Sequence, residues 1–518
     1  MKPFDEHGVF RLTEDGGGLR RVAVRGAGVT ALCQGLGFAI QMIATVILAR
    51  LLTPADFGLV AMVTTFSLLL MNAGFNGITE AVVQRDEIDQ RLATNLFWIT
   101  VGVGCVLSIA FASAGSLLAR FYGDARIAPV AVAMSAAIGL SSASVMHLAL
   151  LKRGLRFSRV SANDLVARSV SVIVSIVLGW AAWGYWALVA GIISLQLTIC
   201  VGAWIRCRWL PGIPRRHAGT RQMVRFAMNT YGHFAANYGT RNLDNFLVGW
   251  FFGPQALGFY KKAYDLCVLP VAQLSDPLNS VAMPVLSRLA GDPERYRRYA
   301  LRALSTLAFI GMGLGAGLAL VGKDLMLVVL GPRWEESGRI FTFFAPGIGA
   351  MLLYLAYTWI HLSLGRPDRL LRWGIVEFVV IGLLFVLGLR YGPIGVATAW
   401  VIASWTLAIP ALWYAGRPAS LGAGAIVMAV WKYVVASALA GGSAVLILAG
   451  MPAINSASGW IAALDRSLIT SVLFAALYLG AIILLYGGLD PLRHIAMLLR
   501  DMLPGRSPAR RTSLVPSL

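Results

Sequence analysis

Apolar runs separated by short polar or basic loops fill most of the chain. A helix that crosses the hydrocarbon of a bilayer needs about 20 apolar residues, and the runs have this length. The pattern therefore predicts an all-α polytopic membrane protein with about 14 transmembrane helices. Their centres are expected near Phe38, Ser67, Val103, Ala137, Ile173, Ile193, Phe234, Leu269, Gly311, Met351, Leu383, Ile402, Ala438 and Leu473.

Basic residues gather in alternate loops between these runs. Arginines precede the first run, follow the fourth, sixth, eighth and tenth runs, and return in the C-terminal tail. Cytoplasmic loops of membrane proteins are enriched in Lys and Arg, so this side is predicted to be cytoplasmic. Both termini then lie in the cytoplasm, which requires an even number of helices.

One segment of the sequence, the repeated segment, occurs in two similar copies. Residues 47–58 (ILARLLTPADFG) return as residues 247–258 (LVGWFFGPQALG), each with an apolar run, a proline and a glycine. The turn at Trp183-Gly184 is likewise echoed at Tyr391-Gly392. Each copy of the repeat holds six predicted helices, so both copies enter the membrane in the same orientation. Parallel repeats of this kind are typical of transporters, whose binding site lies between the two halves.

The repeat divides the chain into two halves and additional segments. The predicted domains are a cytoplasmic N-terminal segment (1–26), a first six-helix half (27–205), a basic cytoplasmic connector (206–226), a second six-helix half (227–416), two additional transmembrane helices (417–488) and a basic cytoplasmic tail (489–518).

Composition agrees with a membrane protein and argues against several other classes. The mean hydropathy is +0.72 and only 13% of residues are charged, far less than a soluble chain of 518 residues needs. The net charge of +20 lies in short loops and forms no soluble basic face, so a nucleic-acid partner is not expected. The five cysteines and the histidines show no metal-ligand spacing, and no cofactor or catalytic constellation is expected.

Polar residues inside the predicted helices are costly and therefore informative. In the seventh helix a stripe of polar residues follows the helical repeat, and in the fifth helix Asp164 and Arg168 are spaced to pair. Such stripes either join helices by hydrogen bonds or line a hydrated cavity. The charged members favour the cavity, since buried charges need partners or water. The stripe of the seventh helix consists of Asn229, His233, Asn237, Arg241 and Asp244.

Two further features are candidates for a role in conformational change. Pro270, Pro277 and Pro284 lie seven residues apart in the eighth helix, where they either act as hinges in alternating access or form static kinks. Glu377, in the eleventh helix, either carries a coupling proton or extends to the membrane interface.

The central sequence is similar to a known family. The segments Asn242–Gly249 (NLDNFLVG), Ala256–Tyr260 (ALGFY) and Met283–Leu289 (MPVLSRL) resemble the signature of bacterial polysaccharide transporters. These are the Wzx-type oligosaccharide flippases, nearest to the colanic-acid exporter branch, within the multidrug/oligosaccharidyl-lipid/polysaccharide superfamily. Leu48–Gly58, Ala81–Arg85 and Leu151–Phe157 agree with it.

The resemblance implies a transporter of the bacterial inner membrane. Its members flip undecaprenyl-pyrophosphate-linked oligosaccharides for exopolysaccharide, capsule or O-antigen (lipopolysaccharide) synthesis, and partner polymerase or export machinery is expected. Arginine binds phosphate oxygens bidentately, which suits it to hold the pyrophosphate. The expected pyrophosphate anchors are Arg168, Arg241, Lys261 and Lys262, the expected glycan contacts are His233, Asn237 and Tyr238, and the expected coupling or ion-pair residues are Asp164, Asp244 and Glu377.

Three alternatives stay open at this point. The first is an exporter of another lipid-linked precursor, and the second is a multidrug-type exporter of the same superfamily. The third is a membrane polymerase or glycosyltransferase that acts on lipid-linked sugars, although such an enzyme generally needs charged residues on a sizeable exterior loop. The longest exterior segments here are short, and Met451–Asp465 carries almost no charge.

Overall fold

A computed structural model describes residues 3–5, 8–10, 19–85, 87–215, 219–451, 459–490 and 492–493. Inside its helices, the side chains of 19–27, 74–76, His233, Asp276, Pro277, Ser280, Pro367 and Leu371 are not described. Over the described residues the chain is helical, and its extended pairings are two isolated β-bridges. The chain divides into two compact units.

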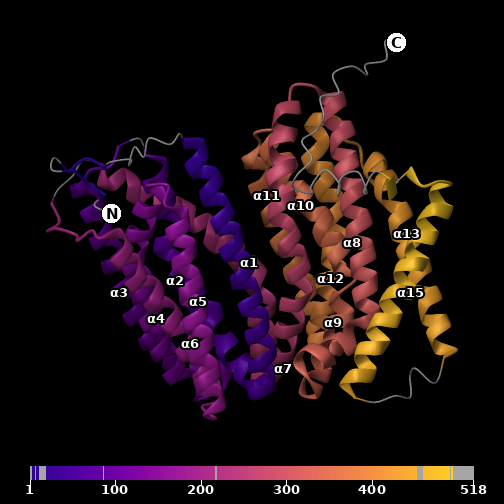
Figure 1. Ribbon diagram of the computed structural model, residues 1–518, viewed down its shortest axis with the longest axis horizontal. Helices are drawn as coiled ribbons and strands as arrows, with labels where there is room; N and C mark the ends of the chain where they lie inside the picture. Colours follow the sequence, from indigo (N-terminus) through magenta and orange to yellow (C-terminus); the bar gives the residue numbers. More distant parts are fainter. Residues whose placement is uncertain are drawn as a thin grey trace. The chain divides into compact units, whose positions relative to one another are not determined.

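Unit 1 comprises residues 1–262 together with the short segments 329–335 and 388–396. Within it, α4 is the central helix and packs against α2, α3 and α6, while α5 packs against α1 and α6 (Figure 1). Its helices are α1 (Leu19–Leu51), α2 (Pro54–Gln84), α3 (Gln90–Tyr122), α4 (Ile127–Arg153), α5 (Phe157–Trp180), α6 (Tyr185–Cys207) and the first part of α7 (Thr220–Leu289).

Unit 2 comprises residues 263–328, 336–387 and 397–518. The helices α13 and α15 form an antiparallel pair at its C-terminal end (Figure 1). Its remaining elements are the second part of α7, α8 (Pro293–Leu330), α9 (Glu335–Phe344), α10 (Gly347–Ser363), α11 (Pro367–Gly388), α12 (Gly392–Gly416), η3 (Arg417–Ala419), α13 (Ala423–Ala449) and α15 (Trp460–Tyr486). The turns η1 (Pro332–Trp334) and η2 (Leu389–Tyr391) belong to the short segments of unit 1.

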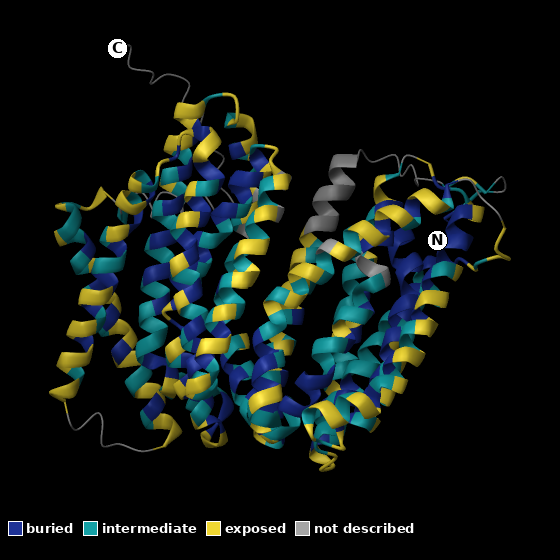
Figure 2. Ribbon diagram, turned by 180° about the vertical axis from the view of Figure 1, so that it is seen from behind, coloured by how far each residue is buried: buried dark blue, intermediate teal, exposed yellow. Residues whose placement is uncertain are grey.

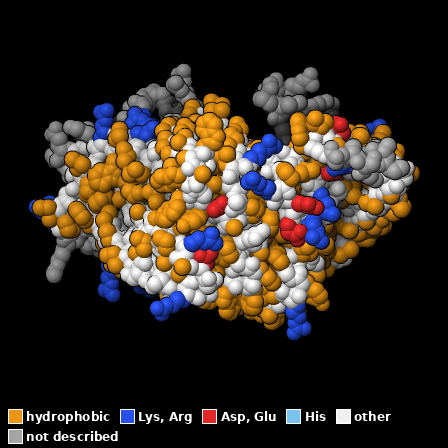
Figure 3. All heavy atoms as spheres, turned by 90° about the horizontal axis from the view of Figure 1, so that it is seen from below, with side chains coloured by type: hydrophobic (Ala, Val, Ile, Leu, Met, Phe, Trp, Pro, Cys, Tyr) orange, Lys and Arg blue, Asp and Glu red, His pale blue; other side chains and the backbone are white. Residues whose placement is uncertain are grey.

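The helices have the length and surface of membrane spans. Among the described residues, ten helical segments are long and apolar enough to cross a bilayer, and Pro332–Phe344 with Gly347–Ser363, bent by 53°, adds an eleventh. Each of the fourteen predicted centres falls within a helix. Buried residues follow the helix sides that face other helices (Figure 2), and apolar side chains are frequent on the face at the helix ends that is seen from below (Figure 3). The predicted all-α polytopic fold is confirmed.

The seventh and eighth predicted helices are the two arms of α7, which meet at a kink. At the kink, Gly253 has non-helical backbone angles (φ 78°, ψ −178°). This positive φ suits glycine, and the next residue, Pro254, has no N–H to donate, so a second helical arm starts there. The prolines at 270, 277 and 284 lie within that arm, where the backbone is helical. The bend in α7 is therefore at Gly253.

The two copies of the repeated segment, residues 47–58 and 247–258, lie directly against each other in unit 1. A Cβ atom on Gly58 would overlap the carbonyl oxygen of Pro254, and a Cβ on Gly258 would overlap that of Pro54. The contact is reciprocal, because each proline begins a helical segment and faces the glycine of the other copy. Small residues allow helix backbones to approach this closely. The repeat thus brings the starts of α2 and of the second arm of α7 together.

Trp334 fills the space beside this crossing. Its side chain is fully buried, and its indole Nε1 donates a hydrogen bond of 2.8 Å to the carbonyl of Ala49. Its ring meets Phe57 and Phe259 edge-on, with centroids 5.4 and 6.1 Å away. Since buried aromatic rings contribute large apolar areas, Trp334 anchors the segment 329–335 to unit 1.

The N-terminal residues are packed against the end of unit 1. Phe4 pairs with Phe10 in a β-bridge, and its ring lies 6.0 Å from that of Trp209. The Arg153 guanidinium lies over Phe10, 5.1 Å from the ring centroid. The chain after Trp209 is held in turn by α3, since Asn95 accepts a hydrogen bond of 2.9 Å from the backbone N–H of Arg215. These contacts join the N-terminal residues, α4 and the connector.

Candidate functional site

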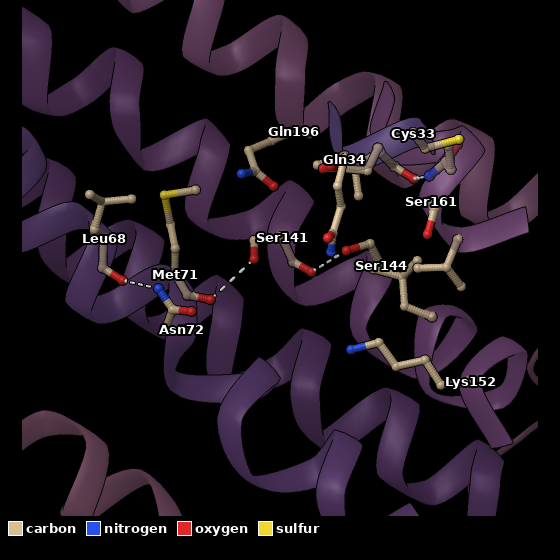
Figure 4. Close-up of a pocket in the computed structure, with 15 residues that line it drawn as sticks. Cys33, Gln34, Leu68, Met71, Asn72, Ser141, Ser144, Lys152, Ser161 and Gln196 are labelled. Carbon is tan, nitrogen blue, oxygen red and sulfur yellow. Dashed lines mark hydrogen bonds between the residues drawn. The ribbon is translucent and has the colours of Figure 1, made fainter. Parts of the chain in front are cut away.

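A polar cavity of about 350 Å³ lies inside unit 1, between α1, α2, α4, α5 and α6 (Figure 4). Nine of its fifteen lining residues carry hydroxyl, amide or charged side chains. Among helices that cross a membrane, such a concentration of polar groups indicates contact with water or with a polar ligand. The lining residues are Cys33, Gln34, Leu68, Met71, Asn72, Ser141, Ser144, Leu148, Lys152, Val160, Ser161, Asn163, Asp164, Gln196 and Ile199.

Several of these polar groups donate to the backbone and keep their oxygens as acceptors. Ser141 Oγ donates to the carbonyl of Met71 (3.1 Å), and Ser144 Oγ donates to that of Ser141 (2.7 Å). Asn72 Nδ2 donates to the carbonyl of Leu68 at 2.7 Å. A hydroxyl that donates one bond still offers lone pairs. Figure 4 shows these groups around one space, with Gln34 beside Ser144 and Gln196 on the side of Ser141.

Two adjacent basic residues at the end of α4 have different surroundings. Arg153 Nη1 donates to the carbonyls of Val82 (2.8 Å) and Arg85, and thereby holds the end of α2. Lys152 instead lines the cavity with its side chain (Figure 4). A lysine ammonium on a flexible stem reorients readily toward a ligand oxygen. Lys152 is therefore the cation of this site.

Asp164 and Arg168, both predicted site residues, form an ion pair on α5. Arg168 Nε donates to Asp164 Oδ2 at 2.7 Å, and both side chains are nearly half exposed (44% and 46%). Asp164 lines the cavity, whereas Arg168 lies outside the lining and leans on α1, with its Cδ 3.4 Å from where a Cβ of Gly37 would be. The arginine thus positions the carboxylate that faces the cavity.

We expect Arg168→Gln to leave the fold intact. A half-exposed pair of this kind contributes about 1 kcal/mol or less, so the unfolding temperature should stay close to that of the wild type. Thermal unfolding of the detergent-purified protein measures this, with Arg288→Gln, on the exposed surface, as the control. A loss of folding on Arg168→Gln would contradict the assignment of Arg168 as a positioning residue.

The predicted residues on α7 whose side chains are described lie outside the lining of this cavity. Asn237 and Arg241 are exposed, and the His233 side chain lies outside the described residues. Tyr238 uses its hydroxyl to donate to the carbonyl of Thr65 (3.0 Å), as Tyr231 does to that of Leu69 (3.1 Å). These two tyrosines, seven residues apart, attach α7 to α2, which is the helix-joining role that the sequence left open for polar residues.

The two lysines predicted as anchors follow the bend of α7. Lys262 Nζ lies over the ring of Phe57, 4.1 Å from its centroid, in a cation–π contact. Lys261 is half-buried and electrostatically close to Asp244. Neither lysine lines the cavity.

Asp244 is buried, with 2% of its surface exposed. The hydroxyl of Tyr260, which is fully buried, donates to Asp244 Oδ2 at 3.0 Å. Because Asp244 precedes Gly253 and Tyr260 follows it, this hydrogen bond connects the two arms of α7 across the bend.

In unit 2, the Glu377 carboxylate accepts a hydrogen bond from a neighbouring helix. Tyr354 on α10 donates its hydroxyl to Glu377 Oε2 at 3.0 Å, and Trp373 Nε1 donates to the same hydroxyl oxygen at 2.8 Å. The half-buried carboxylate therefore ends a chain of three side chains between α10 and α11. An internal hydrogen bond of this kind disfavours extension of Glu377 to the interface, and its role in coupling stays a prediction.

Comparison with known proteins identifies the family of this chain. A family model described as "Polysaccharide biosynthesis protein" matches residues 47–339, more than half of the chain. The chain belongs to this family. The match includes the cavity helices from α2 to α6, the bend of α7 and Trp334.

Relatives in the polysaccharide biosynthesis family are distant in sequence. The lipopolysaccharide biosynthesis protein WzxC of Escherichia coli is 23% identical over 61% of this chain, and the match spans 65% of that relative's length. The succinoglycan biosynthesis transport protein ExoT of Rhizobium meliloti is 21% identical over 69% of this chain and 73% of its own. The teichuronic acid biosynthesis protein TuaB of Bacillus subtilis is 23% identical over 66% and 70%.

Solved structures agree on the fold. The lipid II flippase MurJ, in an inward closed conformation, matches 89% of this chain and 99% of its own with a TM-score of 0.70 and 13% identity. An inward-facing multidrug resistance transporter of the MATE family matches 77% and 98% with a TM-score of 0.57, also at 13% identity. At this identity the likeness concerns the fold. The relative ExoT, which is named as a transport protein, favours a transporter over the membrane enzyme that the sequence left as an alternative.

Sequence reasoning missed most of the cavity lining in this family member. The sequence pattern singled out neither Lys152 nor the serines of α4 as site residues. Their spacing is the signal that was available: Ser141, Ser144, Leu148 and Lys152 follow one another at steps of three and four, so they share a face of one helix. Among the described residues, no group of three or more His, Cys, Asp or Glu side chains is arranged to hold a metal ion.

Proposed function

We propose that this protein moves a lipid-linked oligosaccharide from one leaflet of a membrane to the other. The observation that carries the proposal is the polar cavity within the membrane helices of a member of the polysaccharide biosynthesis family. A glycan cannot cross about 30 Å of hydrocarbon without polar partners, whereas its lipid tail remains in the bilayer. A relative named for transport of succinoglycan and a structural neighbour named as a lipid II flippase support this proposal.

The finer assignments belong to the same proposal. The cargo is an undecaprenyl-pyrophosphate-linked repeat unit, the membrane is the bacterial inner membrane with both termini in the cytoplasm, and the protein delivers to polymerase or export machinery. Movement occurs by alternating access, with the bend of α7 and Pro270, Pro277 and Pro284 as hinges. Arg241, which is exposed on α7, and the two lysines after the bend are the pyrophosphate anchors.

A multidrug exporter is the second candidate, because a MATE transporter shares the fold. Sites for lipophilic drugs are lined mainly by apolar and aromatic side chains. Among the residues whose side chains are described, no aromatic residue lines this cavity, and nine of the fifteen lining residues carry an amide, a hydroxyl or a charge. The lining therefore favours a sugar-bearing cargo.

Leaflet movement in proteoliposomes tests the function. A fluorescent undecaprenyl-pyrophosphate oligosaccharide is placed in both leaflets, and an impermeant reductant is added outside. We expect the protected inner pool to become accessible only when the protein is present, and this access to decrease strongly in Arg241→Gln. No protein-dependent movement of several glycans, with or without a proton gradient, would contradict the proposed function; normal movement in Arg241→Gln would remove that residue as an anchor.

A further inference from the structure

Resting on the proposed function, we infer that the cavity of unit 1 is a subsite for an uncharged sugar of the cargo, and that the pyrophosphate binds elsewhere. The site consists of Gln34 on α1, Ser141, Ser144 and Lys152 on α4, Asp164 on α5 and Gln196 on α6. This differs from the sequence expectation, which placed the glycan contacts on α7.

The charges of the lining exclude a pyrophosphate. Among the described lining residues, Lys152 and Asp164 carry charges, and these have opposite signs. A pyrophosphate carries at least two negative charges and is bound by arginine forks or several cations. In this cavity it would face the Asp164 carboxylate, and Lys152 would be its cation within the lining, because Arg168 lies outside the lining and is already paired with Asp164. A neutral sugar meets no such repulsion, and its hydroxyls donate to Asp164 and accept from Lys152.

The hydrogen-bonding groups of the lining suit a sugar. The amides of Gln34 and Gln196 each offer two donors and an acceptor. Among the described residues neither of these two amides has a hydrogen-bond partner, and both border the cavity (Figure 4). Ser141 and Ser144 donate to backbone carbonyls and present acceptor oxygens. Sugar hydroxyls act as donor and acceptor at once, so this mixed set satisfies them.

The size of the cavity limits the ligand to a small part of the glycan. At about 350 Å³ it lies near the lower end of ligand pockets, which span about 300 to 1,000 Å³. One or two sugar rings fill such a volume, while a longer repeat unit extends beyond it. Leu68, Met71 and Leu148 supply apolar surface for the C–H faces of a ring.

The thiol of Cys33 can be used to measure whether a ligand occupies the cavity. This residue lines the cavity and is partly exposed, whereas Cys200, Cys207 and Cys267 are buried. Cys105 on α3 is exposed, so Cys105→Ser leaves Cys33 as the reactive thiol. The rate at which a water-soluble maleimide labels Cys33 then measures whether a ligand occupies the cavity.

The experiment compares two lipids on the full-length Cys105→Ser protein in detergent. One is undecaprenyl pyrophosphate bearing a neutral disaccharide, and the other is undecaprenyl pyrophosphate without sugar. We expect the sugar-bearing lipid to slow labelling of Cys33 about fivefold at a concentration four times its Kd. The lipid without sugar should slow labelling less than about twofold at the same concentration. The free disaccharide at high concentration should also protect.

Matched variants test the amides. Gln34→Leu combined with Gln196→Leu should abolish protection, while Gln41→Leu, two turns further along α1 and outside the lining, should retain it. Size-exclusion chromatography and thermal unfolding verify that each variant is folded. If the double variant does not fold, Lys152→Met gives the same test, with loss of protection expected.

The outcomes separate this inference from the proposed function. Equal protection by both lipids would assign the cavity to the pyrophosphate and overturn the inference. Absence of protection by either lipid, in a protein that moves the cargo between leaflets, would place the cavity outside the path and leave the function standing. Absence of both protection and leaflet movement would overturn both.

Discussion

Gly58→Ala is expected to unfold unit 1 or to lower its unfolding temperature strongly, with loss of transport. The added methyl group would overlap the carbonyl oxygen of Pro254, which belongs to the backbone and cannot rotate away. The two helices must therefore separate, which disrupts the neighbouring contacts of Trp334 with Phe57 and Phe259. Overpacking of a well-packed core lowers the free energy of unfolding by about 1–3 kcal/mol, and a clash with backbone atoms should cost at least the upper value of this range. Thermal unfolding followed by size-exclusion chromatography measures the loss.

The reciprocal contact supplies the controls for this prediction. Gly258→Ala should act like Gly58→Ala, since its Cβ would overlap the Pro54 carbonyl in the same way. Gly239→Ala on α7 has no atom within 4 Å of the new Cβ, so it should be neutral or slightly stabilising. Unchanged stability of Gly58→Ala would contradict the close crossing of the two repeat copies.

The repeat and the apolar runs predicted the architecture because both are properties of the local sequence. Every predicted helix centre lies in a helix, since a run of about 20 apolar residues has few other structures available in a membrane. The junction between the seventh and eighth helices was predicted as well, because a glycine followed by a proline is a usual mark of a helix end. Here Gly253 adopts the positive φ that a tight bend requires, and Pro254 restarts the helix at once.

The candidate site was predicted only in part, because a lining depends on how helices are rotated against one another. Asp164 was selected from its spacing to Arg168, and it does face the cavity. Lys152 and Arg153 are adjacent basic residues, and the sequence alone does not tell their roles apart. In the structure Lys152 lines the cavity, whereas Arg153 donates to the carbonyl of Val82. Tyr238 shows a contact that the sequence pattern did not predict, since its hydroxyl donates to the backbone of α2, and its contact with sugar stays a prediction.

The second large effect is expected at Asp244, where the sequence left proton exchange and a structural role open. Asp244→Leu should destabilise the protein by about 1–3 kcal/mol, because the buried Tyr260 hydroxyl loses this acceptor. The hydrogen bond spans the bend at Gly253, so its loss should also release the second arm of α7 from the first. Hydrogen–deuterium exchange over residues 250–262 should increase, and transport should decrease in parallel.

Asp244→Asn separates the two roles. The amide oxygen of asparagine still accepts from Tyr260, and its size is nearly that of aspartate, so the fold and the bend should persist. We expect leaflet movement by Asp244→Asn to remain within a few-fold of the wild type, and Tyr260→Phe to lose about 1 kcal/mol of stability through the same bond. A folded Asp244→Asn protein that no longer moves the cargo would show that Asp244 must ionise during transport. Retained movement would instead assign the buried carboxylate to holding the bend, and would leave Glu377, with its Tyr354 and Trp373 partners, as the carboxylate to test for coupling.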